Sequence, residues 1–435
     1  MIAGWPYGVF TLKMSMIKNS TWNILGVVIP SAIALPTMGV LSRLLGIEQF
    51  GLFTLAFAIV GYATLFDAGL SRAVIRAVAM NHGDKALNRL VMGTATGAVI
   101  GLSLLATLLL WFGADKVVSL LHVSPEHFDN AVAGFRWLSL CVPPFLLATV
   151  WFAYLEGNER FGEFNVLRTF SNSLLAIAPL IAVLIEPSFS ATVIGLVLAR
   201  VVSMALAYWP LYKDFPEGIR TFKVLVFKEL LKFGSWMTVS NIISPLMVYF
   251  DRFVLSHMVG AGRVSFYTAP AEAVSRMLII PNAVARVVFP LLSKSGEDAA
   301  RQANKAFWGL LLISLAMVLP ILILAPWIMT VWMGPEYGGE AAQILRILVV
   351  GFIFNALAQI PFAKIQARGH SRTTAMIHLA ELLPYLGLLV VCIQHFSILG
   401  AAIAWTIRVT VDYLALEYFA RRTPPLPTPV YQQSP

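Results

Sequence analysis

Five arginines stand inside long apolar stretches of this sequence, where a charged side chain is costly and usually serves a function. They are Arg200, Arg252, Arg276, Arg286 and Arg408. Arg200 is the clearest case, because it lies in the middle of the run LVLARVVSMAL and has no acidic residue within four positions on either side. A guanidinium binds the oxygens of a phosphate in pairs, so we expect Arg200 to line a polar cavity that receives an anion. An interhelical salt bridge is the alternative.

Two of these arginines have an acidic residue one helical turn away. Arg276 follows Glu272 by four residues, which places both on one face of a helix. Arg408 precedes Asp412 by four residues, with the same consequence. Each arginine could therefore form a structural ion pair with its neighbouring acid or contact a substrate, and the sequence supports both interpretations equally.

The remaining cations occupy more ordinary positions. Asp251 and Arg252 are adjacent and point in different directions, so each needs its own partner or water. Arg252 lies in the outer third of its apolar stretch and could instead extend outward to the membrane interface. Arg72 and Arg286 stand at the ends of their stretches that the loop charges place in the cytoplasm, where cations commonly set topology. Substrate contact is the alternative for both.

Acidic and histidine side chains in the apolar stretches could bind protons or ions. Asp67 lies toward the end of one stretch, and Glu381 lies inside another with His378 one turn before it. A His/Glu pair at this spacing could titrate and relay a proton, although a satisfied polar contact is an equal alternative. The candidate ion-coupling residues are Asp67, Asp251, His378, Glu381 and Asp412.

No sequence pattern predicts catalysis or a bound cofactor. The two cysteines, Cys141 and Cys392, both lie in apolar runs without a disulfide or metal-binding spacing. The sequence contains no nucleophile elbow, no phosphate-binding glycine loop and no H-E-x-x-H motif. We therefore expect no enzyme, no metal site and no cofactor, and no ATP-driven pump built within this chain.

The elements that position these residues are predicted to be membrane-spanning helices. Apolar residues make up 58% of the 435-residue chain and charged residues only 12%, which excludes an ordinary soluble domain. A spanning helix needs ~20 mostly apolar residues, so the runs predict an all-α integral membrane protein with 12 transmembrane helices. The runs lie at about 20–42, 51–71, 91–112, 135–155, 169–186, 190–211, 235–257, 265–290, 306–328, 344–363, 374–394 and 398–419.

The loops on the two sides of these spans differ in charge. Lys and Arg number 21 in one alternate set of loops and five in the other, so the positive-inside rule places both termini in the cytoplasm. The formal net charge of +9 is explained by these loops, and we expect no nucleic-acid partner. Residues 1–19 are predicted to be a cytoplasmic or interfacial segment without a signal-peptide pattern, and 421–435 a disordered Pro-rich cytoplasmic tail.

The two halves of the chain match one another in sequence. Arg72 precedes Arg286 by 214 residues. Arg200 precedes Arg408 by 208, so the offset drifts as small insertions would make it drift. Six spans in each half imply a parallel repeat, with its pseudo-two-fold axis along the membrane normal. The prediction is a six-helix N-lobe at 20–211 and a six-helix C-lobe at 234–420, joined by a basic cytoplasmic linker at 212–233. Chance matching between apolar helices is the alternative.

Several short motifs occur in an order that resembles the polysaccharide-transporter branch of the multidrug/oligosaccharidyl-lipid/polysaccharide exporter superfamily, which includes the O-antigen flippases. The motifs are LGIEQFGL at 45–52, FDAGLSR at 66–72, EGNER at 156–160, YFDRF at 249–253, GPEY at 334–337 and QARG at 366–369. Each motif alone is weak, and the resemblance rests on their order and topology. It covers about residues 18–420, and the segment before Lys18 departs from the family pattern.

The resemblance implies a bacterial cytoplasmic-membrane protein that moves polyprenyl-diphosphate-linked oligosaccharide units from the inner to the outer leaflet by alternating access, coupled to an ion gradient. Such units serve the biosynthesis of O-antigen lipopolysaccharide or exopolysaccharide. Membrane lipid would surround the polyprenyl tail, and a polysaccharide polymerase or chain-length protein would be a partner. The diphosphate would meet Arg200 and Arg408, with Arg72, Arg252, Arg276 and Arg286 as further contacts.

Three other functions compete with this interpretation. A multidrug/cation antiporter of the same superfamily would need an acid-lined lobe, with Asp67 or Asp251 essential. A membrane polysaccharide polymerase or ligase is expected to carry a large periplasmic loop, whereas the longest outward connection here, about 113–134, has roughly 22 residues. A non-transporting scaffold would not explain cations within the spans of both halves.

Overall fold

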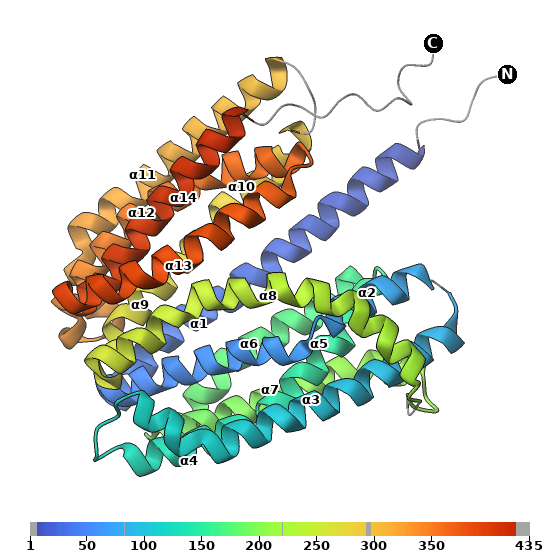
Figure 1. Ribbon diagram of the computed structural model, residues 1–435, viewed down its shortest axis with the longest axis horizontal. Helices are drawn as coiled ribbons and strands as arrows, with labels where there is room; N and C mark the ends of the chain where they lie inside the picture. Colours follow the sequence, from blue (N-terminus) through green and yellow to red (C-terminus); the bar gives the residue numbers. More distant parts are fainter. Residues whose placement is uncertain (1–6, 82, 220, 293–296, 423–435) are drawn as a thin grey trace. The chain divides into compact units, whose positions relative to one another are not determined.

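The computed structural model is helical throughout the residues it describes, which are 7–81, 83–219, 221–292 and 297–422 (Figure 1). Side chains are described within these ranges except at 7–25, 235–248, 290–291 and 297–300. Residues 1–6 of the predicted N-terminal segment and 423–435 of the predicted tail lie outside the described residues. The elements are α1 (Tyr7–Tyr62), η1 (Ala63–Asp67), α2 (Leu70–Met80), α3 (Lys85–Leu120), α4 (Phe128–Ser139), α5 (Val142–Gly157), α6 (Phe161–Ile185), α7 (Phe189–Asp214), α8 (Val224–Val259), α9 (Ala261–Met277), α10 (Ile279–Leu292), α11 (Glu297–Met333), η2 (Pro335–Gly338), α12 (Glu340–Ala367), α13 (Ser371–Phe396) and α14 (Ile398–Arg422).

The contacts divide the chain into two compact units. The N-terminal unit comprises Met1–Phe253 and Gly260–Gly262, and the C-terminal unit comprises Val254–Val259 and Arg263–Pro435.

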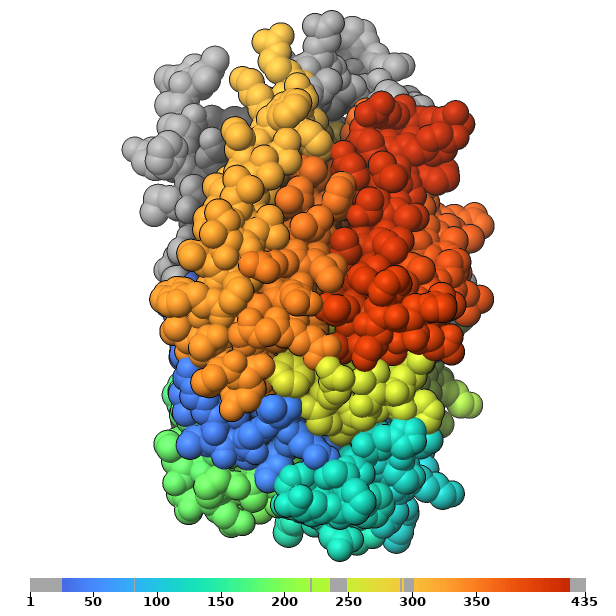
Figure 2. Space-filling view, turned by 90° about the vertical axis from the view of Figure 1, so that its left-hand side faces the viewer, coloured from blue at the N-terminus to red at the C-terminus, as the bar shows by residue number. Residues whose placement is uncertain are grey.

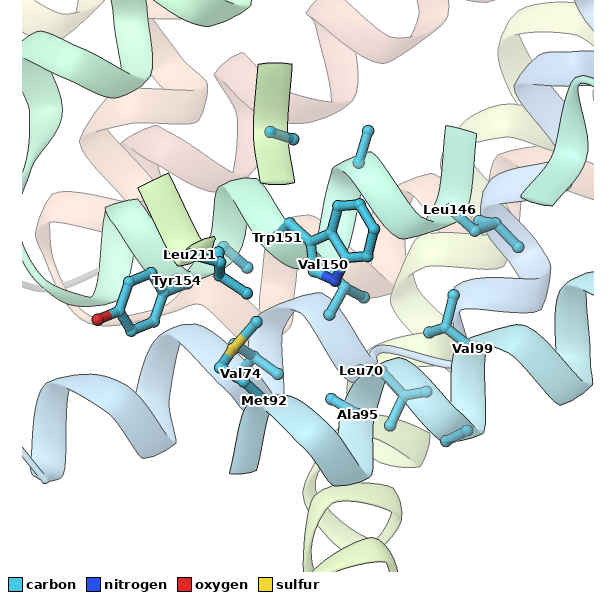
Figure 3. Close-up of a cluster of buried hydrophobic side chains, with 14 of the residues drawn as sticks. Leu70, Val74, Met92, Ala95, Val99, Leu146, Val150, Trp151, Tyr154 and Leu211 are labelled. Carbon is cyan, nitrogen blue, oxygen red and sulfur yellow. The ribbon is translucent and has the colours of Figure 1, made fainter. Parts of the chain in front are cut away.

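The core of the N-terminal unit lies where α2, α3, α5 and α7 meet (Figure 3). Trp151 stands at its centre and donates a 3.0 Å hydrogen bond from its indole nitrogen to the Thr96 hydroxyl. The core holds α5 against α7, and α7 carries Arg200. The side chains labelled in Figure 3 are Leu70, Val74, Met92, Ala95, Val99, Leu146, Val150, Trp151, Tyr154 and Leu211.

Two glycines allow the chain of this unit to change direction. α1 is interrupted at Gly46, whose φ of 75° lies in the left-handed region, so the runs predicted at 20–42 and 51–71 fall on either side of a break. After η1 the backbone is left-handed at Ala68 and Gly69, and α2 then begins. A Cβ at Gly69 would overlap the backbone of Gly234 in α8, so this turn needs glycine for its space as well as for its conformation.

Part of the predicted linker at 212–233 is docked on α3. A Cβ at Gly93 would overlap the carbonyl oxygen of Thr221, so the linker backbone lies directly against this glycine. Arg89 holds the same segment through a 2.7 Å ion pair with Glu217. α8 begins at Val224, so the second half of the predicted linker is helical. The loop charge predicted a basic segment but gave no sign of this docking.

In the C-terminal unit α12 packs against both α11 and α14, and α14 packs against α13. The space-filling view shows α11 (amber), α12 (orange) and α14 (red) next to one another (Figure 2). Glycines allow close approach at two of these contacts: a Cβ at Gly351 would meet Trp405, and one at Gly400 would overlap the Cys392 carbonyl. The close approach of α13 to α14 brings their polar side chains together.

Nine helical segments within the described residues are long and apolar enough to cross a membrane. The run predicted as a single span at 265–290 differs from the prediction, because it forms two helices, α9 and α10, with Pro281 in the first turn of the second. The nine segments are Gly26–Asp67, Lys85–Leu120, Phe128–Gly157, Phe161–Ile185, Phe189–Asp214, Arg301–Met333, Glu340–Ala367, Ser371–Phe396 and Ile398–Arg422.

Candidate functional site

Arg200 is a partly buried cation without a carboxylate partner among the described residues of the N-terminal unit. It lies near the middle of α7, and its guanidinium carbon is 4.3 Å from the centre of the Phe145 ring on α5. The thiol of Cys141, just before α5, is the titratable group that interacts with it. Its Nε is buried and has no hydrogen-bond partner among the described residues. The interhelical salt bridge that the sequence left open is therefore not found in the described part of the chain.

Arg408 occupies a different environment in the C-terminal unit. Its guanidinium carbon lies 5.2 Å from the centre of the Tyr385 ring on α13, and its buried Nε also lacks a hydrogen-bond partner among the described side chains. Unlike Arg200, it interacts with a carboxylate, that of Glu381. The predicted helical-turn pair with Asp412 is replaced by contacts across helices, because Asp412 turns toward α13.

Asp412, Glu381 and His378 form one cluster with Arg408. The Nε2 of His378 lies 3.4 Å from the Oδ1 of Asp412, across the contact between α13 and α14. Glu381 interacts with Asp412, Arg408 and His378 together. The Phe362 ring of α12 stacks on the imidazole at 5.7 Å with only 9° between the planes, which fixes the orientation of the histidine. The two separate pairs expected from sequence spacing are thus a single four-residue cluster.

Arg276 forms the ion pair that its spacing predicted. Its Nη2 lies 3.5 Å from the Oε2 of Glu272, one turn earlier on α9. Both side chains are partly buried. An i, i+4 pair on the surface of a helix contributes ~0.3–0.5 kcal/mol, so the contact itself is modest.

Asp251 and Arg252 are both buried near the end of the N-terminal unit, with only 4% and 5% of their surfaces exposed. The outward extension of Arg252 considered from the sequence is therefore wrong. The Arg252 guanidinium carbon lies 5.1 Å from the centre of the Tyr249 ring, and the Arg252 backbone N–H donates to Asp251 Oδ1 at 2.8 Å. Tyr62 packs against Tyr249 and Phe253, so aromatic rings of α1 and α8 surround this pair.

The remaining candidates have local surroundings. Arg72 and Arg286 are exposed, as expected for cations at the ends of spans. Asp67 is buried and accepts hydrogen bonds from the Ser71 hydroxyl at 2.8 Å and from the Ser71 backbone N–H at 3.3 Å. This bonding stabilises the start of α2, so Asp67 has a structural task besides any role with ions.

The structural roles of two sequence motifs were not predicted from residue spacing. In LGIEQFGL, Glu48 accepts a 2.8 Å hydrogen bond from the backbone N–H of Ser124, and Gln49 accepts one of 2.8 Å from that of Phe189, the first residue of α7. The only signal in the sequence was a polar pair two and three residues after a glycine, which can satisfy the free N–H groups of other segments. The motif therefore helps to anchor the helix that carries Arg200.

In the EGNER motif, Arg160 ties the start of α6 to the end of α7. It pairs with Glu163 at 2.6 Å and with Asp214 at 2.5 Å, and the Tyr154 hydroxyl donates to the same Asp214 carboxylate at 2.9 Å. Partial burial alone would lower the pKa of Arg160, but its hydrogen bonds and ion pairs with Glu163 and Asp214 outweigh this and raise the pKa. The ionised pair holds one end of α7 in place.

The fold is similar to that of solved helical membrane proteins. It is similar to a solved inward-facing multidrug resistance transporter of the MATE family, with a TM-score of 0.73 and 16% identity over 92% of this chain and 94% of that chain. It is also similar to the lipid II flippase MurJ in an inward closed conformation, with a TM-score of 0.76 and 15% identity over 93% of this chain and 87% of that chain. At these identities the likeness concerns the fold alone.

The sequence comparisons identify the family. The profile of the family described as polysaccharide biosynthesis protein matches residues 16–296. A Shigella flexneri protein named as a candidate O-antigen transporter is 44% identical over 411 residues, which cover 94% of this chain and 98% of that protein. The chain therefore belongs to the polysaccharide biosynthesis family of multi-pass membrane transporters. It is not an enzyme, so the polymerase or ligase alternative is wrong.

Proposed function

We propose that the protein is a flippase that moves polyprenyl-diphosphate-linked oligosaccharide units from the cytoplasmic to the outer leaflet of a bacterial cytoplasmic membrane. The observation that carries this proposal is Arg200, a permanent cation on α7 that is partly buried, has a buried Nε and has no carboxylate partner among the described residues. A buried charge without a partner is costly, and an anionic ligand would repay that cost. The 44% identity to a candidate O-antigen transporter supports a glycan carried on such an anion.

Arg200 and Arg408 are proposed to bind the diphosphate, because each presents a guanidinium whose Nε is free for an acceptor. An aromatic ring covers a face of each guanidinium, and a phosphate would bind at the N–H groups, which point outward in the guanidinium plane. Further contacts are assigned to Arg72, Arg252, Arg276 and Arg286. Ion coupling is assigned to Asp67, Asp251, His378, Glu381 and Asp412, and a polysaccharide polymerase or chain-length protein is the expected partner.

The proposed topology has 12 spans with both termini in the cytoplasm. The nine candidate segments support it once Gly26–Asp67 is divided at Gly46, and once α8 and the α9–α10 pair are each added as a span. The lobes are proposed at 20–211 and 234–420, related by a parallel repeat and joined by the linker at 212–233. Alternating access then exposes the arginines first to one leaflet and then to the other.

A multidrug/cation antiporter is the second candidate. One observation favours it: Glu381 and Asp412 place two carboxyl groups together in the C-terminal unit, as a cation carrier would need. The carboxylate-free surroundings of Arg200 argue against it, because a cation would be repelled there.

Deletion of the gene, followed by analysis of the lipid-linked intermediates, tests the proposed function. We expect a polyprenyl-linked glycan to accumulate on the cytoplasmic side and surface polymer to disappear.

Variants of Arg200, expressed in the deletion strain, test the site. Arg200→Ala loses charged hydrogen bonds worth ~1.5–3 kcal/mol, so we expect it to restore roughly 10- to 100-fold less flipping than the native chain, while Arg200→Lys keeps part of it. Arg136→Ala removes a partly exposed arginine that is paired with Asp115, and it serves as the matched control. Full polymer with Arg200→Ala at normal membrane levels would defeat the site, and loss of drug efflux without glycan accumulation would favour the antiporter.

A further inference from the structure

The cluster of the C-terminal unit lies deep within its helices. Glu381 is ten residues beyond the first residue of α13, and Asp412 is ten residues before the last residue of α14. At 1.5 Å per residue each carboxyl group is therefore ~15 Å from the helix end, close to the middle of a membrane-spanning helix. Charged groups at this depth are costly and are kept only with partners or for a function.

The two carboxyl groups of the cluster lack a donor between them. Glu381 lies within hydrogen-bonding range of Asp412, yet neither Glu381 oxygen nor Asp412 Oδ1 has a hydrogen-bond donor among the described residues. Two ionised carboxylates are both acceptors and repel one another, so their contact is favourable only if one proton lies between them. The geometry is thus that of a carboxyl pair that holds a single proton.

The groups around this pair come from three helices. His378 on α13 and Arg408 on α14 are the two groups of basic character that interact with Glu381. α12 contributes the Phe362 ring that stacks on His378. Lys364, two residues after Phe362 on α12, interacts instead with Glu417, Arg368 and Arg421. Arg408 is therefore the permanent cation whose charge the carboxyl pair balances.

We propose that the Glu381–Asp412 pair is a proton-binding site that controls whether Arg408 is free to bind an anion. With both carboxyl groups ionised, their negative charge neutralises Arg408 and repels a diphosphate. With one proton taken up from water onto a carboxyl oxygen, the pair and Arg408 together change from one net negative charge to no net charge, so the diphosphate is no longer repelled and Arg408 can bind it. Substrate and proton then bind the C-terminal unit cooperatively, and the coupling is reciprocal. This inference rests on the proposed function, because it assumes that the ligand of Arg408 is a diphosphate.

The N-terminal unit offers an internal reference. Arg200 interacts with the Cys141 thiol and not with a carboxylate of the described residues, so no such proton site acts on it. Its contribution to anion binding should therefore not change between pH 6 and pH 8. Any change of affinity in this range that depends on Glu381 or Asp412 is then a property of the C-terminal cluster.

The test measures ligand affinity of the purified full-length protein at pH 6 and pH 8. The probe is a farnesyl diphosphate esterified to one glucose, because the two phosphates of such a diester keep a constant charge over this range. One linked proton changes affinity by at most tenfold per pH unit, and we expect the native chain to bind at least fivefold more tightly at pH 6. We expect E381Q and D412N to bind at both values about as tightly as the native chain at pH 6. H378Q should retain the pH dependence with a shifted midpoint.

The controls separate this inference from the proposed function. E417Q removes another carboxylate of α14 and should leave the pH dependence unchanged, and R200K should weaken binding by the same factor at both pH values. A native chain whose affinity does not depend on pH, an unchanged dependence in E381Q and D412N, or its loss in H378Q would overturn the proton site while leaving the flippase intact. Absence of any binding by the native chain would instead contradict the proposed function.

If the native chain binds no ligand, a measurement without ligand still tests the proton site. Infrared difference spectra between pH 6 and pH 8 should show the band of a protonated carboxyl group in the native protein. The band should be missing in E381Q and D412N and present in E417Q. A native protein without this band would overturn the proton site, whatever the ligand.

Discussion

Arg200 in the N-terminal unit and Arg408 in the C-terminal unit occupy matching positions in the predicted repeat but have opposite surroundings. Arg200 has an aromatic ring at 4.3 Å and a thiol. Arg408 has an aromatic ring at 5.2 Å, and it also has two carboxyl groups and an imidazole in its cluster. Arg200 is therefore a fixed positive charge, whereas the charge around Arg408 can change by one proton.

The physical reason is that a guanidinium does not lose its own proton under ordinary conditions. A site made of arginine and aromatic rings therefore keeps its charge, and the ring face contributes only ~0.5–2 kcal/mol toward holding it. A site that also contains two carboxyl groups can carry a net negative charge or, with one proton bound, be neutral.

Placing a carboxylate beside Arg200 should abolish the difference between the two units. Phe145→Glu would pair the guanidinium with an internal anion, and we expect flipping to fall more than 100-fold, because the pair would be worth several times a single hydrogen bond at a buried position. Surface polymer in a deletion strain, normalised to membrane levels of the variant, measures the effect. Normal polymer with this variant would show that the fixed charge of Arg200 is not needed.

Removing each arginine should produce losses with different pH dependence. Arg200→Ala should lower affinity for the prenyl diphosphate diester by roughly 10- to 100-fold at both pH 6 and pH 8. Arg408→Ala should lower it by a similar factor at pH 6 and by much less at pH 8, where its carboxyl neighbours already neutralise it. Equal losses at both pH values for Arg408→Ala would contradict the contrast between the units.

Disturbing the contact between α13 and α14, which brings the C-terminal cluster together, should lower the thermal stability of the protein. Gly400→Ala forces a Cβ against the Cys392 carbonyl, and overpacking of this kind costs ~1–3 kcal/mol, so the midpoint of thermal unfolding should fall by several degrees. Gly387→Ala, on α13 where nothing lies within 4 Å of the added atom, is the matched control. If both variants unfold at the native temperature, the close approach of the two helices is not required.

Truncating the aromatic support of Arg200 should give the smallest change. Phe145→Leu keeps most of the apolar volume and loses the ring face, which is worth ~0.5–2 kcal/mol. We expect flipping to fall about 2- to 20-fold, with the same factor for affinity at pH 6 and pH 8. A pH-dependent loss in this variant would mean that a titratable group other than those near Arg408 acts on Arg200.

Much of the fold could be predicted from the sequence, because hydropathy and loop charge depend on local composition. Long apolar runs predicted the all-helical membrane class, and the family motifs predicted the family that the comparisons show. The helix-turn spacing also predicted the ion pair of Arg276 with Glu272. Local rules worked less well where the chain bends, since the run at 265–290 gave two helices and not one.

Contacts between helices could not be predicted from hydropathy, loop charge or spacing along one helix. Spacing on one helix paired His378 with Glu381 and Arg408 with Asp412, whereas packing of α13 on α14 joined all four. The burial of Arg252 among aromatic rings and the docking of the linker on Gly93 likewise depend on segments distant in sequence. None of these contacts leaves a periodic signal in the chain.

The sequence by itself determined that this chain resides in a membrane as helices and that it carries arginines within them. Both follow from the cost of exposing polar groups to lipid, which depends on composition alone. The tertiary structure decided which arginine has an acidic neighbour, because that depends on the angle at which one helix meets the next. Arg200 faces an aromatic ring and a thiol, and Arg408 faces two carboxyl groups, only because different helices pack against each.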